Sequence, residues 1–185
     1  MKSFKQLVEG VYDPNIFKAF FLAGGPGRGK SFVVRKTTGG LGLKIVNSDT
    51  AFEKLLKDVD FSLDFRDMSP EKTLERDKIR KRAKEVTDKM KSNFVAGRLG
   101  MIIDGTGAEY GKIEKQVKML QQLGYDTHMI FVNTSLDTAI ERNNQRTRKL
   151  PLDIVKTYWN NVQANIGKFQ RLFGMSNMII VDNNS

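Results

Sequence analysis

The sequence predicts an α/β fold in which five parallel strands form one sheet with helices on both faces. Three observations carry this prediction. Short apolar runs alternate with helix-type periodicity along the chain, a glycine-rich loop follows the first apolar run, and the length is 185 residues. Strands separated by helices are joined by crossovers, which favour parallel pairing. This length suits one α/β core, so we expect a single domain over residues 1–185.

The glycine-rich loop is Gly24-Gly25-Pro26-Gly27-Arg28-Gly29-Lys30-Ser31, a complete G-x-x-x-x-G-K-[ST] pattern. In such a loop the backbone N–H groups surround phosphate oxygens, the lysine reaches the β- and γ-phosphates, and the serine hydroxyl ligates Mg²⁺. The apolar run before it and a helix expected over residues 30–37 supply the required context. We therefore expect a P-loop NTPase three-layer sandwich that binds ATP and Mg²⁺ through Gly25, Gly27, Arg28, Gly29, Lys30 and Ser31.

Composition narrows the function classes. The chain has no cysteine and one histidine, which excludes disulfides and thiolate chemistry and argues against histidine-based metal or triad sites. It has no long apolar run and no signal-peptide pattern, so we expect a cytoplasmic protein without membrane contact. The net charge of +10 favours anionic partners such as nucleic acid, although it can also serve solubility alone.

The first third of the chain is expected to hold two strands. Residues 1–16 precede the first strand, which covers residues 17–23. Residues 43–47 form the second strand, and a helix begins near Asp49. The mixed stretch 58–67 shows no clear period, and we expect a loop there.

A long amphipathic helix is predicted between Ser69 and Gly97. Ser69 is a good cap, Pro70 fits the first turn, and Glu71 suits the positive end of the helix. Apolar side chains recur at steps of three or four in the set Ile79, Ala83, Val86, Met90 and Phe94. The basic segment 78–84 is either a solvated outer face or a track for substrate phosphates.

The second half of the chain should continue the alternation. The expected elements are strand 101–104, helix 112–123, strand 127–133, helix 135–142, helix 151–173 and strand 178–181. His128 lies within a strand, and we expect it to pack there rather than to act in catalysis.

Polar residues follow four of the expected strands, where open α/β sheets bind their ligands. These strand ends are the loop itself and residues 47–49, 104–106 and 133–135. Asp49 is the candidate general base for an acceptor hydroxyl, with capping of the next helix as its alternative role. Asp104 ends a strand of Walker B type and is expected to hold Mg²⁺ or to position the acceptor, with Thr106 beside it in substrate binding.

A polar break between two helices, residues 142–150, has the character of a lid. It carries Arg142, Arg146 and Arg148. A mobile lid can close on a triphosphate and bring an arginine to the charge that develops in the transition state. We expect Arg142 and Arg146 to act in catalysis with Lys30, and Arg148 to bind the nucleotide; a basic helix end facing water is the alternative.

With these motifs the chain resembles the P-loop kinases of the polynucleotide kinase and zeta toxin group. Two regions resemble the kinase half of phage polynucleotide kinase: Val46-Asn47-Ser48-Asp49, and Arg142-Asn143-Asn144-Gln145-Arg146 followed by Lys149, Pro151, Val155 and Tyr158. This resemblance implies that Asp49 is the base and Arg146 the transition-state arginine. Residues 103–107, Ile-Asp-Gly-Thr-Gly, are more similar to zeta toxins, which usually have glutamate where Asp104 stands.

Three functions are therefore open. The first is an ATP-dependent kinase that phosphorylates a hydroxyl of a nucleic acid or nucleotide, for example a 5′-hydroxyl end or a hydroxymethylated base in DNA. The second is a kinase of a UDP-amino sugar, as the resemblance to zeta toxins implies. The third, from another class, is an NTP-driven switch. We expect no obligate protein partner and, because no phosphatase half follows, no bifunctional end-healing enzyme.

Overall fold

The computed structural model describes residues 16–25, 30 and 42–184. Its elements are β1 (Lys18–Ala23), β2 (Lys44–Val46), α2 (Ser48–Asp58), α3 (Pro70–Ala96), β3 (Met101–Asp104), α4 (Tyr110–Gln122), β4 (Asp126–Asn133), α5 (Leu136–Gln145), α6 (Leu152–Ala164), α7 (Ile166–Phe173), the short 3-10 helix η2 (Met175–Asn177) and β5 (Met178–Asp182). All five expected strands are present. The expectations for residues 1–15, for the helix after the loop, and for Gly27, Arg28, Gly29 and Ser31 lie outside the described residues.

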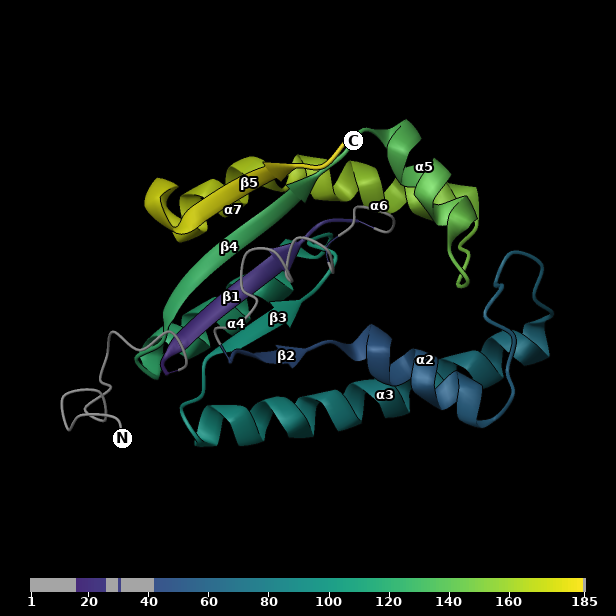
Figure 1. Cartoon of the computed structure of the whole chain (residues 1–185), viewed down its shortest axis with the longest axis horizontal. Helices are drawn as coiled ribbons and strands as arrows, with labels where there is room; N and C mark the ends of the chain where they lie inside the picture. The colour runs from purple at the N-terminus through teal and green to yellow at the C-terminus, as the bar shows by residue number, and fades with distance from the viewer. Residues whose placement is uncertain (1–15, 26–29, 31–41, 185) are drawn as a thin grey trace, which may run out of the picture.

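The five strands form one sheet in the order β2-β3-β1-β4-β5, with every neighbouring pair parallel (Figure 1). The predicted α/β class is therefore confirmed. The chain starts in the centre with β1, adds β2 and β3 on one side, and then adds β4 and β5 on the other. Such a reversal opens a crevice beyond the carboxyl ends of the central strands, and this crevice is where the phosphate loop leaves β1.

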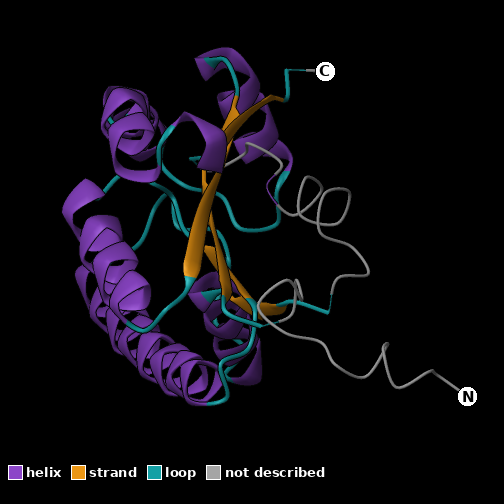
Figure 2. Ribbon diagram, turned by 90° about the vertical axis from the view of Figure 1, so that its left-hand side faces the viewer, coloured by secondary structure: helices purple, strands orange, loops and turns teal. Residues whose placement is uncertain are grey.

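Side chains alternate between the two faces of the sheet along β1 and β4. Phe21 and Phe131 pack on one face against Val117 of α4 and Phe169 of α7. Figure 2 shows the sheet edge-on with helices stacked beside it. The other face gathers the buried side chains Leu22, Ile102, Ile130 and Val132. Because both faces are apolar, the sheet has the character of one that is covered on both sides.

A third apolar cluster joins α2, α3 and the loop between them. Phe52 of α2 and Ala83 of α3 enclose Phe65, which comes from the stretch 58–67 that we expected to be a loop. The N–H of Phe65 donates to the carbonyl of Lys149 at 3.3 Å, and Asp64 forms an isolated parallel bridge with Lys149. This loop therefore connects the α2–α3 pair to the segment that follows α5.

The long helix α3 confirms its predicted start and end, but one side chain of the expected apolar stripe is misplaced. Ser69 caps α3 by accepting from the N–H of Lys72, and Gly97 ends it. Val86 is 50% exposed, whereas Ala83 and Thr87 are buried. The buried stripe continues from Ala83 by four residues to Thr87, because the packing of α3 against its neighbours, and not hydrophobicity alone, sets which side is covered.

The helix expected over residues 151–173 is in fact two helices, α6 and α7, that meet at Asn165. The buried side chain of Asn165 donates to the carbonyls of Gly107 and Ala108, both at 3.0 Å. These bonds anchor the loop after β3, which explains why a polar residue interrupts the helix there. The lid also begins later than expected, because α5 extends to Gln145 and leaves only residues 146–150 irregular.

Candidate active site

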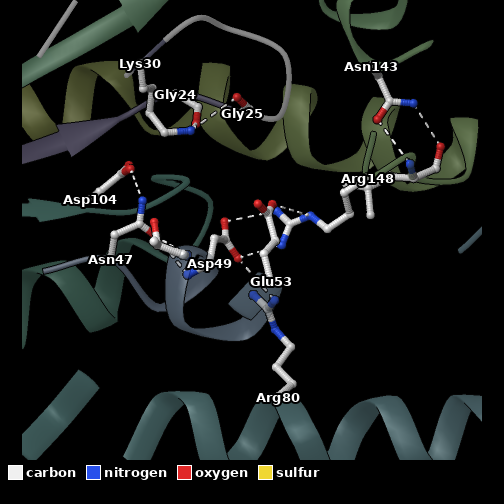
Figure 3. Close-up of polar contacts among 12 residues, drawn as sticks. Gly24, Gly25, Lys30, Asn47, Asp49, Glu53, Arg80, Asp104, Asn143 and Arg148 are labelled. Atoms are coloured by element: carbon white, nitrogen blue, oxygen red, sulfur yellow. Dashed lines mark hydrogen bonds and ion pairs between the residues drawn. The ribbon is translucent and has the colours of Figure 1, made fainter. Parts of the chain in front are cut away.

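The start of the phosphate loop is tied to the end of β3. The N–H of Gly24 donates to the carbonyl of Thr106, and the N–H of Gly105 donates to the carbonyl of Leu22, both at 3.0 Å. Lys30 Nζ donates to the carbonyl of Gly24 at 2.7 Å and lies 3.5 Å from that of Gly25 (Figure 3). The ammonium group therefore lies over the beginning of the loop, beside the end of β3.

Asn47 links the ends of β2 and β3. Its Nδ2 donates to Asp104 Oδ2 at 2.7 Å, and its Oδ1 accepts from the backbone N–H groups of Asp49 and Thr50 at 2.7 and 3.3 Å. Asn47 is thus the cap of α2, and the alternative that Asp49 caps this helix is wrong. The carboxylate of Asp49 is therefore not used to cap α2.

Asp104 has a carboxylate oxygen that is not satisfied. Its Oδ1 is buried and has no hydrogen-bond partner among the residues that the structure describes. Burial raises the pKa of Asp104; the charge of Lys30 opposes this rise, the charge of Asp49 adds to it, and Arg146 opposes it. A buried oxygen without a partner costs free energy unless a ligand completes it. Asp104 Oδ1 can therefore bind either a Mg²⁺ ion or the hydroxyl of an acceptor.

Asp49 is held by two arginines in this structure. Arg80 Nη1 of α3 lies 3.1 Å from Asp49 Oδ1, and Arg148 donates to the same carboxylate at 3.3 Å (Figure 3). Burial by itself raises the pKa of Asp49, but the ion pairs with Arg148 and Arg80 outweigh it and hold the pKa below its ordinary value. The carboxylate is therefore ionised at neutral pH, as a general base must be.

Arg148 is the more enclosed of the two arginines. Only 8% of its side chain is exposed, and its guanidinium lies 6.0 Å from the ring centroid of Phe52. Its Nε is 3.4 Å from Glu53 Oε1, close enough for an ion pair but without hydrogen-bond geometry. We expected Arg148 to bind the nucleotide, and here it is engaged with two carboxylates of α2.

Arg146 lies among the charged groups of the site. Burial lowers its pKa, Arg148 lowers it further, and Glu53, Asp49 and Asp104 oppose this effect. An arginine nevertheless stays protonated in a protein. Within the described part of the chain its guanidinium has no hydrogen bond or ion pair. Its electrostatic interactions therefore place it near Asp49 and Asp104.

Asn143 holds the end of the segment 146–150, for which we expected a lid. Its side chain is buried, donates to the carbonyl of Leu150 at 3.0 Å, and accepts from the N–H of Leu150 at 3.1 Å. Arg142, one residue earlier, donates to the carbonyl of Asn183 at 2.9 Å and so contacts the segment after β5. The structure thus places Arg146 and Arg148 near Asp49, whereas Arg142 contacts Asn183.

The end of β4, which we expected to carry chemistry, is occupied by structural contacts. Asn133 Oδ1 accepts from Gln163, the carbonyl of Thr134 accepts from Trp159 Nε1, and Ser135 caps α5. His128 stacks on Phe20 and bonds to Asp126, so its expected packing role is confirmed.

A pocket of about 280 Å³ opens beside the two aspartates. It lies between the ends of β1 and β3, the start of α2, and the helices α3 and α4, and its lining includes Asp49, Arg80, Lys84, Asp104, Thr106 and Lys112. Both aspartates thus line this pocket, and Thr106, which lines it too, is hydrogen-bonded to Gly24 at the start of the phosphate loop. Thr106 also accepts from the N–H of Ala108 at 3.3 Å, which shapes the pocket floor.

Sequence reasoning missed several members of this site. Phe52 and Glu53 belong to a helix whose pattern indicated only packing and solvation. Arg80 lies in the basic segment 78–84, but nothing in the sequence pairs it with Asp49. Asn143 was part of a motif, but its contact with Leu150 has no local signal. Asn165 carried one hint, since a buried asparagine within an apolar helix pattern needs polar partners.

The loop, the sheet order and the carboxylates at the strand ends define a P-loop kinase-like α/β protein. A family profile described as an AAA domain (AAA_33) matches residues 20–168, and the chain belongs to this family. The resemblance to P-loop kinases is thereby confirmed. No curated protein is similar enough in sequence to count as a match.

Several solved structures are similar in fold. A chain of the AvrRxo1-ORF1:-ORF2 structure with ATP has a TM-score of 0.70 at 14% identity, over 89% of this chain and 54% of that chain. The PezAT toxin–antitoxin system of Streptococcus pneumoniae gives 0.61 at 15% identity, over 91% and 70% of the two chains. The Pnkp1/Rnl/Hen1 RNA repair complex gives 0.60 at 18% identity, over 90% and 49%. The chain thus spans about half the length of the AvrRxo1-ORF1:-ORF2 chain that it matches. At such identities the likeness concerns the fold.

Among the described residues, no helix is both long enough and apolar enough to span a membrane.

Proposed function

We propose that the protein is an ATP-dependent kinase that transfers the γ-phosphoryl group to a hydroxyl of a nucleic acid or nucleotide-type acceptor. A 5′-hydroxyl end and a hydroxymethylated base in DNA both belong to this class. One observation carries the proposal: Asp49 and Asp104 line one pocket together with Thr106, whose carbonyl accepts from Gly24 where the phosphate loop begins. Phosphoryl transfer needs little covalent chemistry, and it depends on an acceptor held in line with the γ-phosphate.

Each charged residue of the site has a role in this reaction. Asp49 accepts the proton of the acceptor hydroxyl while the acceptor oxygen bonds to the γ-phosphorus, and the bond from that phosphorus to the bridging oxygen of ADP breaks. Lys30 and Arg146 neutralise charge on the phosphate oxygens. Asp104, through its unpartnered Oδ1, orients either the acceptor or the cation. Mg²⁺, when bound with ATP, supplies further charge neutralisation, and Ser31 and Asp104 are the residues that would hold it.

The arginines around Asp49 must change partners during this cycle. A carboxylate that accepts from both Arg80 and Arg148 is a poor base, because its pKa is held low. A triphosphate in the loop offers Arg148 a competing anion with more charge than a carboxylate. Entry of ATP therefore draws Arg148 towards the phosphates, in agreement with its expected role in nucleotide binding. This frees Asp49 Oδ2 for the acceptor while Arg80 stays at Oδ1.

A UDP-amino sugar is the second candidate acceptor. It is supported by the likeness of residues 103–107 to zeta toxins and by the fold similarity to the PezAT system. Gly107, however, has a packing reason to be glycine, because a Cβ there would come within 2.8 Å of the Cβ of Ala23. That part of the likeness therefore says less about the acceptor than the pocket does.

The absence of cysteine fits a cytoplasmic enzyme.

The experiment is a transfer assay with γ-labelled ATP against DNA, RNA, nucleosides, nucleotides and UDP-amino sugars. We expect label on an acceptor of the nucleic acid or nucleotide class. Lys30→Ala removes the point charge at the β- and γ-phosphates but leaves the backbone of the loop, so transfer should be almost abolished while ATP binding falls only in part. Steady ATP hydrolysis that no acceptor changes would favour a switch, and transfer by Lys30→Ala at the wild-type rate would refute the assigned site.

A further inference from the structure

The wall of the pocket that α3 and α4 form carries several lysines. It is built from one side of α3 and one side of α4, and it presents Lys84, Lys91 and Lys112. We propose that this wall binds a phosphate group carried by the acceptor itself, so that the substrate is a small phosphorylated alcohol such as a nucleoside monophosphate. This inference rests on the proposed kinase function and names the acceptor of that same site.

The lysines of the wall differ in whether a protein group already pairs with their charge. Lys91 lies 3.7 Å from Asp88 and 3.4 Å from Gln116 Oε1. The side-chain ammonium groups of Lys84 and Lys112, which come from different helices, have neither an ion pair nor a hydrogen bond among the residues described. Two ammonium groups without protein partners that line one cavity favour an anion between them.

The wall also carries acidic groups, and their positions separate two ends of the pocket. Asp104 interacts electrostatically with both Lys30 and Asp49, so these two aspartates mark the part of the pocket nearest the start of the phosphate loop, where a hydroxyl must lie for transfer. Asp88 is engaged with Lys91. Glu109 lines the pocket too and would repel an anion at its own position. An acceptor with a hydroxyl at one end and a phosphate at the other therefore fits only with its phosphate towards Lys84 and Lys112.

The residues of the basic segment 78–84 lie on different faces of α3. Arg80 and Lys84, one turn apart, line the pocket, whereas Lys78, Lys81 and Arg82 do not. Of the two interpretations of this segment, we apply the phosphate-binding one to Lys84, because Arg80 is engaged with Asp49. The exposed residues Lys81 and Arg82 belong to the outer face.

Pocket size favours a small acceptor. The volume of about 280 Å³ is near the lower end of small-molecule sites, which run from roughly 300 to 1,000 Å³. A polynucleotide is held instead through several phosphates along an extended groove. We therefore assign the wall to a single phosphate group rather than to a strand.

The test measures binding without turnover, by calorimetry on the full chain in the absence of ATP. The probes are adenosine and uridine 3′- and 5′-monophosphates, each paired with its nucleoside. We expect at least one monophosphate to bind about tenfold or more tightly than its nucleoside, and the variant Lys84→Gln/Lys112→Gln to lose that difference. The matched control is Lys81→Gln/Lys115→Gln, which removes the same charge from exposed positions of the same helices outside the pocket. Thermal unfolding checks that both variants fold.

The outcomes separate this inference from the kinase proposal. Equal binding of monophosphates and nucleosides, or an equal loss in the control variant, overturns the inference even if transfer to some acceptor is found. Phosphate-dependent binding that needs Lys84 and Lys112, without transfer to any acceptor, upholds the binding site and refutes the kinase assignment. Preference for an oligonucleotide over its terminal monophosphate, insensitive to Lys84 and Lys112, overturns the assignment to a small acceptor.

Discussion

Asp49 combines two properties that conflict at the scale of one residue. We propose it as the general base, yet Arg148 and Arg80 lower its pKa and so reduce its basicity. Asp104 is the opposite case, since burial raises its pKa and one oxygen has no partner among the described residues. Neighbouring carboxylates with pKa values shifted in opposite directions are typical of functional sites. In such sites one carboxylate is ionised, and the other gains its missing partner when a ligand binds.

The replacement Asp49→Asn tests the base. It removes the proton acceptor but keeps the size of the side chain, and the cap of α2 is unaffected because Asn47 provides it. We expect kcat to fall by roughly 10²–10⁴, the usual contribution of acid–base catalysis. Initial rates with γ-labelled ATP check this, and Asp58→Asn, an exposed carboxylate at the other end of α2, is the control. Unchanged kcat in Asp49→Asn would show that its role is structural.

At the scale of elements, the conformation of residues 146–150, the expected lid, depends on the side chain of Asn143. Asn143 bonds both backbone groups of Leu150 and so closes the segment that carries Arg146 and Arg148. The loop before α3 contacts the same segment through the bond from Phe65 to Lys149. The position of both arginines is thus set by contacts outside the arginines themselves.

Asn143→Ala leaves the N–H and the carbonyl of Leu150 without these partners. We expect a loss of about 1–3 kcal/mol in the free energy of unfolding, the cost of unsatisfied buried groups. We also expect a lower kcat, because Arg146 is less well positioned. Denaturant unfolding and rate measurements check both effects, with the exposed neighbour Asn144→Ala as control. Equal stability of the two variants would contradict the assigned role.

The loop after β3 packs closely against the end of β1. Gly107 has φ of +80°, and a Cβ there would lie 2.8 Å from the Cβ of Ala23, just before the phosphate loop. We expect Gly107→Ala to destabilise the protein by about 1–3 kcal/mol, through backbone strain and overpacking.

Gly111 is the control for this prediction, because a Cβ there meets nothing within 4 Å and the residue is in α4. Gly111→Ala should be neutral or stabilise by up to about 1 kcal/mol. Thermal unfolding of both variants is the measurement. Tolerance of alanine at Gly107 to the same degree as at Gly111 would argue against the tight approach of the two loops.

The net charge of +10 acts at the scale of the whole molecule. Lys81 and Arg82 are on the exposed face of α3, outside the pocket, so they are suited to long-range attraction of polyanions and not to acceptor binding. The charge of the surface and the charge of the pocket wall are therefore separable by mutation.

Salt dependence tests this separation. Single-stranded oligonucleotide binding should weaken with salt by a log–log slope of about −0.7 per phosphate contact, whereas ATP binding should weaken far less. Lys81→Glu/Arg82→Glu should weaken oligonucleotide binding and flatten its slope without changing ATP binding. Fluorescence titration of a labelled oligonucleotide at several salt concentrations is the measurement. Absence of oligonucleotide binding at low salt would exclude a polynucleotide acceptor and leave the small nucleotide and the UDP-amino sugar.

The sequence by itself determined the strands, the ends of α3, the phosphate loop and the candidate roles of Asp49, Asp104 and Arg146, because each is recorded in residues that lie next to one another or at a helical or strand period. Only the tertiary structure decided the partners. Asn47 meets Asp104 across 57 positions, and Arg148 meets Asp49 across 99. Contacts of this kind depend on how elements cross and pack, and no local pattern encodes them. The same reason explains why Lys84 and Lys112, two ordinary surface lysines by sequence, face one pocket only once α3 and α4 are folded beside the sheet.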